Sequence, residues 1–78
     1  MSIAQLAAAY LIGIVKNHPF VDGNKRVGWA VAWTFVRLNE CDIAATREEK
    51  YDFVFGVAAG TIGEQACDDW MAEHVIRE

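Results

Sequence analysis

The chain has 78 residues, 54% of them hydrophobic and 23% charged, and its formal net charge at pH 7 is −4. This length allows one small domain, and the acidic balance argues against a general nucleic-acid binder. Because no apolar run is long enough to span a membrane and no secretory signal is visible, we expect a cytoplasmic protein without membrane contact. A chain this short cannot cover so much apolar surface alone, so it self-associates, binds a partner or belongs to a larger domain.

The first two helices are predicted at residues 3–17 and at about 24–39, from apolar residues that recur every three or four positions. Pro19 disfavours helical geometry at His18 and should end the first helix. The second helix carries no charged side chain over residues 27–36 and is apolar all round. We therefore place it at the centre of a bundle, with a partner surface on the part that three other helices could barely enclose.

The third helix is predicted to begin after Thr46, since Thr-Arg-Glu-Glu at 46–49 is a capping box, and to end at Gly60. Its apolar stripe is expected to contain Tyr51, Val54, Phe55 and Ala58. Residues 41–45 are a connector or a short strand-like stretch.

The fourth helix is predicted to start at Gly63 or Glu64 and to turn one face inward. That face is expected to contain Ala66, Cys67, Trp70, Met71, His74 and Val75, with His74 a boundary residue of no assigned role. Trp29, Trp33 and Trp70 are interpreted as core or interface residues, and Cys41 and Cys67 as buried or half-buried thiols. The fold class is all-α, one domain over 1–78, a bundle of about four helices with a loop-to-helix site between the first two.

That site is the run His-Pro-Phe-Val-Asp-Gly-Asn-Lys-Arg at residues 18–26. Taken alone, His18 is more often a capping or surface residue, and Asp22-Gly23-Asn24 an ordinary turn. Lys25 and Arg26, however, lie at the positive end of a helix dipole, where two cations cost stability unless an anion is bound there. Together these residues favour a phosphate site at a helix N-terminus beside a histidine able to accept a proton.

The run resembles the signature of the Fic/Doc family, His-Pro-Phe-x-Asp/Glu-Gly-Asn-Gly/Lys-Arg, and its lysine is closer to the death-on-curing (Doc) branch. Residues 6–10, 37–39 and 64–70 also look like this family. The resemblance implies an all-α fold and an ATP–Mg²⁺ site. The implied roles are His18 as general base, Asp22 as the Mg²⁺ ligand, Gly23 and Asn24 as the anion cradle, and Lys25 and Arg26 as phosphate ligands that also serve catalysis.

Doc-branch relatives are similar to kinases that pass the γ-phosphoryl of ATP to a threonine of elongation factor Tu and are held by Phd-type antitoxins. Fic adenylyltransferases have glycine at the position of Lys25 and a second arginine at the position of Trp29, so the resemblance favours phosphoryl over adenylyl transfer. Adenylyl transfer is the first alternative. Doc-family chains are longer at the N-terminus than this one. The second alternative is therefore a non-catalytic domain that binds a partner or self-associates, for example as a homo-oligomer.

Overall fold

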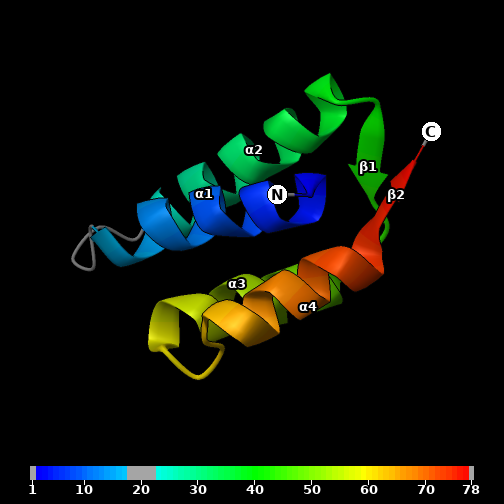
Figure 1. Cartoon of the computed structure of the whole chain (residues 1–78). Helices are drawn as coiled ribbons and strands as arrows, with labels where there is room; N and C mark the ends of the chain where they lie inside the picture. The colour runs from blue at the N-terminus through cyan, green and yellow to red at the C-terminus, as the bar shows by residue number, and fades with distance from the viewer. Residues whose placement is uncertain (1, 18–22, 78) are drawn as a thin grey trace.

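The computed structural model describes residues 2–17 and 23–77, which form four helices and one two-stranded ribbon (Figure 1). The elements are α1 (Ile3–Asn17), α2 (Gly23–Leu38), β1 (Cys41–Ile43), α3 (Arg47–Ala59), α4 (Glu64–His74) and β2 (Val75–Arg77). The predicted all-α class is confirmed. The bounds of the first three helices agree with the sequence to within one residue.

The helices form two layers, with α1 beside α2 in one and α3 beside α4 in the other (Figure 1). α1 contacts all three other helices, so its buried face forms the middle of the core. The largest fully buried side chains are Phe53, Leu11, Met71, Val36, Val57 and Cys67. Because both layers contribute to it, the core fixes the spacing between α2 and α3, which carry the site described below.

The capping box at the start of α3 forms as predicted. The Thr46 hydroxyl accepts a hydrogen bond from the Glu49 amide at 3.1 Å, and the Glu49 carboxylate accepts one from the Thr46 amide at 2.9 Å. Gly60 ends the helix with a φ of 83°, a left-handed conformation that favours glycine. Local signals of this kind satisfy backbone groups within a few residues, which is why they can be read directly from sequence.

The fourth helix is shorter than predicted, because Val75 leaves it and pairs with Ile43. β1 and β2 run antiparallel, with Asp42 opposite Ile76 and Cys41 opposite Arg77. The strand-like alternative for residues 41–45 is therefore confirmed over Cys41–Ile43. The ribbon closes one end of the two-layer arrangement and anchors the last described residues to the connection between α2 and α3.

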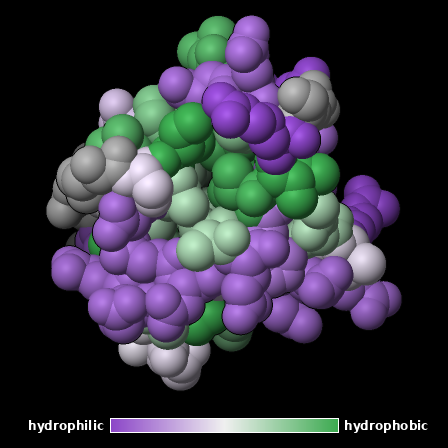
Figure 2. Space-filling view, turned by 45° about the vertical axis from the view of Figure 1, so that its right-hand side comes forward, coloured by the Kyte–Doolittle hydropathy of each residue, from purple (hydrophilic) through white to green (hydrophobic). Residues whose placement is uncertain are grey.

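The predicted central position of α2 is wrong, since one side of this helix faces outward. Val27, Val31 and Leu38 are exposed along it. Tyr10 of α1, also exposed, contacts the half-buried Phe35 with 5.2 Å between ring centroids and an angle of 58° between the rings. Figure 2 shows hydrophobic surface at the level of α1 and α2, above a hydrophilic band at the level of α3 and α4. Among the described residues, no helix is long and apolar enough to cross a bilayer.

The predicted stripe of α3 is also wrong. Tyr51 and Phe55 are 67% and 53% exposed, while Phe53 and Val57 are buried. The inward face of α3 is set by the Trp70 ring of α4, which stacks on Phe53 with 3.9 Å between centroids. Of the predicted stripe only Val54 is buried, because spacing along the chain contains no information on the α4 ring that packs on Phe53.

One smaller prediction is wrong, since Ala66, assigned to the inward face of α4, is exposed. Trp33, predicted to be a core or an interface residue, is 42% exposed and lies outside the core, where its indole N–H donates to the Asp42 carboxylate at 3.1 Å. Cys41 and Cys67 are both buried, as predicted.

Candidate anion-binding site

The residues predicted to bind phosphate surround the beginning of α2. Gly23 is its first residue, Lys25 is half-buried and Arg26 is exposed. His18 and Asp22 lie outside the described residues, and so does the side chain of Asn24. The structure therefore places the two cations of the motif in the first turn of α2.

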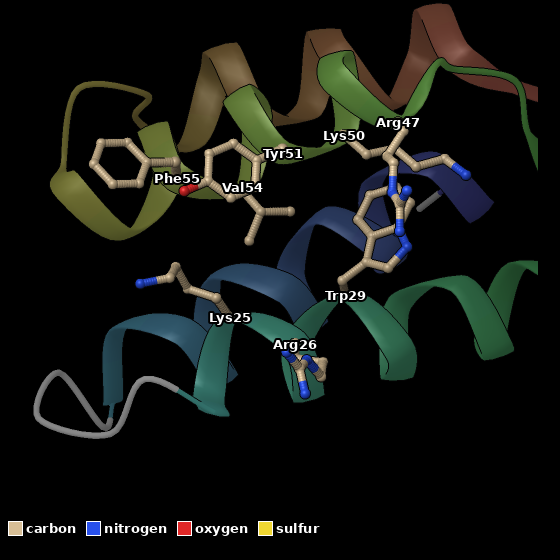
Figure 3. A pocket seen from close by; sticks show the side chains of 8 residues that line it. All are labelled: Lys25, Arg26, Trp29, Arg47, Lys50, Tyr51, Val54 and Phe55. Carbon is tan, nitrogen blue, oxygen red and sulfur yellow. The ribbon is translucent and has the colours of Figure 1, made fainter.

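These two cations line a pocket of about 500 Å³ between α2 and α3 (Figure 3). The lining residues are Lys25, Arg26 and Trp29 of α2 with Arg47, Lys50, Tyr51, Val54 and Phe55 of α3. This volume lies in the usual range of small-molecule sites. The pocket combines charged side chains with aromatic rings, the composition expected for an anionic ligand that also carries a flat apolar part.

Each end of the pocket has a lysine placed above an aromatic ring. Lys25 Nζ lies 5.9 Å from the ring centroid of Phe55, and Lys50 Nζ lies 5.8 Å from that of Trp29. Figure 3 shows Trp29 reaching from α2 toward α3 at the end where Arg47 and Lys50 lie. Ring faces attract cations at this distance, so both ammonium groups have a preferred position inside the pocket.

The pocket gathers positive charge that the described residues do not neutralise. It contains four of the chain's seven lysines and arginines, in a protein of net charge −4. Among residues 2–17 and 23–77, no carboxylate forms an ion pair with any of these four side chains. Arg37, by contrast, lies 3.7 Å from the Asp42 carboxylate. Four like charges lining one pocket repel each other, and an anionic ligand would relieve that repulsion.

Sequence reasoning found Lys25 and Arg26 but missed Arg47 and Lys50. The signal was present, because residues 47, 50, 51 and 54 recur at three and four and therefore share one helix face. The capping box drew attention to the start of this helix as a structural feature, and Tyr51 was assigned to the core. Only the packing of α3 beside α2 shows that its cations join those of the motif.

A close approach of α1 and α2 supports the motif end of the site. A Cβ at Gly28 would lie 2.8 Å from Val15 Cγ2 and 3.3 Å from Leu11 Cδ1. Both neighbours are buried residues of α1. Gly28 therefore lets α2 lie close to α1, one turn after the two cations.

Two other reactive side chains lie apart from the pocket. Burial raises the pKa of the Cys67 thiol to about 12, so this cysteine is a protonated core residue at neutral pH. His74 stacks on Trp70 at 3.9 Å, with Nδ1 2.7 Å from the Trp70 carbonyl oxygen and Nε2 3.6 Å from the Glu49 carboxylate. The structure thus gives His74 a role in joining α4 to α3.

Comparison with known proteins adds a family and one relative. The model of the Fic/DOC family matches residues 1–36, which include the whole motif. A protein named Toxin Doc, from Mycolicibacterium smegmatis (strain ATCC 700084 / mc(2)155), is 54% identical over 72 residues. That match covers 92% of this chain and 51% of the relative, so the chain spans about half the length of the toxin it resembles.

Proposed function

The chain belongs to the Fic/DOC family, and we propose that it acts as a Doc-like toxin domain of a toxin–antitoxin module. Its proposed reaction moves the γ-phosphoryl group of ATP to a hydroxyl of a protein target of the translation-factor kind. The observation that carries the proposal is the pocket between α2 and α3, where four cations without an ion-pair partner among the described residues surround aromatic rings beside the motif.

The residues of the pocket fit the phosphates and the base of a nucleotide. Lys25 and Arg26 supply charge for phosphate oxygens at the first turn of α2, where helix amides and the dipole favour anions. Tyr51 and Phe55, whose rings stack 6.2 Å apart, offer a flat surface near Lys25 for a base. The metal, held by Asp22, would supply charge that balances the phosphates.

The proposed step needs one base and an in-line approach. His18 takes the proton of the target hydroxyl, the hydroxyl oxygen forms a bond to the γ-phosphorus, and the bond to the β,γ-bridging oxygen breaks as ADP leaves. Lys25 and Arg26 hold the oxygens on which charge develops. Lys25 replaces the glycine of adenylyltransferases, which supports phosphoryl rather than adenylyl transfer.

The position of the transferred label separates the two reactions. The chain is incubated with Mg²⁺, a bacterial lysate and ATP labelled at either the α or the γ phosphorus, with the His18→Ala variant as control. We expect label from the γ position only, and about 10²- to 10⁴-fold less transfer by the variant, as for a lost general base. Label from the α position would instead establish adenylylation.

An exposed apolar surface favours protein binding as a second function. The face formed by Tyr10, Val27, Val31, Phe35 and Leu38 lies on the side of α2 away from the pocket. Monomeric proteins rarely expose such a continuous face, so we propose that it is covered by a Phd-type antitoxin helix or by another copy of the chain. If neither label is transferred, this binding function replaces the catalytic one.

A further inference from the structure

We propose that the end of the pocket formed by Arg47 and Lys50 docks an acidic segment of a protein partner. This goes beyond the proposed reaction and requires no nucleotide. The motif cations Lys25 and Arg26 belong to the first turn of α2, whereas Arg47 and Lys50 come from the first turn of α3. The pocket therefore has two positive ends on different helices.

The α3 end is built to hold carboxylates in place. Lys50 is half-buried with its ammonium group over Trp29, while Arg47 beside it is exposed. Neither forms an ion pair with a carboxylate of residues 2–17 or 23–77. The N-terminal end of the α3 dipole adds positive potential at the same place, and Glu48 and Glu49 of the first turn offset part of it. An arginine and a lysine beside an aromatic ring bind carboxylates better than they bind neutral groups.

The shape of the surface favours a peptide over a compact anion. A second hollow of about 390 Å³ is lined by Arg47, Glu48, Tyr51 and Asp52, so Arg47 and Tyr51 line both hollows. The two hollows together offer a longer surface along α3 than a compact anion would cover. An extended chain could place acidic side chains on Arg47 and Lys50 and a basic one near Glu48 and Asp52.

The test measures binding of a fluorescein-labelled peptide of alternating glutamate and alanine, without nucleotide, by fluorescence anisotropy. The site variant is Arg47→Gln/Lys50→Gln, because glutamine retains helix propensity while removing charge. The matched control, Arg37→Gln/Arg77→Gln, loses the same two charges from exposed positions outside the pocket. A peptide of alternating glutamine and alanine measures the part of binding that does not depend on carboxylates.

We expect the site variant to bind the acidic peptide about tenfold more weakly or worse, and the control to stay within about twofold of the wild type. Inorganic triphosphate should bind the site variant almost as well as the wild type and bind Arg26→Gln more weakly. Equal losses in the site and control variants would overturn the proposal, because general attraction would then explain binding. Loss of both peptide and triphosphate in the site variant would overturn it too, in favour of one undivided polyanion site. Since no ATP is present, failure of phosphoryl transfer leaves this result unaffected.

Discussion

Glu49 joins the beginning of α3 to the end of α4 through a single carboxylate. One oxygen accepts the Thr46 amide hydrogen bond at 2.9 Å, and the other lies 3.6 Å from His74 Nε2. The hydrogen bond from the Thr46 amide, followed by the interaction with the Thr46 side chain, lowers the pKa of Glu49 below its ordinary value of 4.5. A lowered pKa in the folded state stabilises the fold above the unfolded pKa and ceases to do so as the pH falls through the folded value.

We therefore predict that Glu49→Gln makes stability less sensitive to acid. Glutamine keeps a capping box but cannot be ionised, so the variant should lose less stability than the wild type as the pH falls below about 4.5. Urea denaturation across this pH window measures the difference. Glu48→Gln is the matched control, since Glu48 takes no part in the capping box. The interpretation is wrong if both variants respond to acid alike.

His74 offers a second prediction, because its ring stacks on Trp70 while its nitrogens meet polar partners. Replacement by alanine removes both contributions, whereas phenylalanine keeps the stacking. We expect His74→Ala to lower the free energy of unfolding by about 1–3 kcal/mol and His74→Phe by less than about 1 kcal/mol. Thermal and urea unfolding at neutral pH provide the comparison. Equal losses would mean that the polar contacts, among them the one to Glu49 of α3, stabilise the fold more than the stack on Trp70 within α4 does.

At this scale, sequence identified residues whose neighbours are close along the chain. Thr46 and Glu49 could be predicted as a capping pair because both partners fall within one helical turn. Glu49, the partner of His74 Nε2, by contrast, comes from another helix. Arg47 and Lys50 were missed for the same reason, since the residue that places them in the pocket, Trp29 beneath Lys50, belongs to α2.

Among the elements, the contact between α1 and α2 is the one most sensitive to a single methyl group. A Cβ at Gly28 would meet Val15 Cγ2 at 2.8 Å, and the stiff side chain of valine has little room to move. We predict that Gly28→Ala lowers the free energy of unfolding by about 1–3 kcal/mol, despite the better helix propensity of alanine. Because α2 carries the motif, Gly28→Ala should also weaken anion binding.

Gly13 is the matched control within α1, since a Cβ there has no heavy atom within 4 Å. We expect Gly13→Ala to raise the free energy of unfolding by about 0.5–1 kcal/mol through helix propensity and a less flexible unfolded chain. Denaturant titration of both variants tests the pair. If Gly28→Ala also stabilises the protein, the two helices can separate without loss and the close contact does not matter.

The positions of the helices were more predictable than the faces they bury. Pro19, the capping box and Gly60 are local signals, and the helix bounds next to them agree with the sequence. The buried face of α3 depends on Trp70, and the end of α4 depends on the pairing of Val75 with Ile43. Both contacts join segments that are distant in the chain, so the local periodicity of apolar residues cannot predict them.

For the molecule as a whole, the two sides of α2 differ in character. One lines the cationic pocket, and the other carries exposed Val27, Val31 and Leu38. We predict that the protein associates with increasing concentration through the apolar side, and that Val31→Glu reduces this association by desolvating a charge in the contact. Sedimentation velocity over a concentration series measures it.

Ala30→Glu adds the same charge at an exposed position of the same helix, away from the apolar stripe. It should leave association unchanged and retain the helical circular dichroism of the wild type. A wild-type protein that stays monomeric throughout the series would leave the apolar side to a different partner. Equal effects of the two substitutions would point to net charge rather than to the face.

The ribbon of β1 and β2 has a consequence for synthesis on the ribosome. α1 and α2 are neighbours in the chain and can pair as soon as both have emerged, since they need only a short loop to close. Cys41, however, finds Arg77 only when almost the whole described chain is available, and α1 can meet α4 only after residues 64–74 have emerged. The surface of α1 that α4 covers therefore stays open until α4 has emerged, a period in which a chaperone or a partner protein has first access to it.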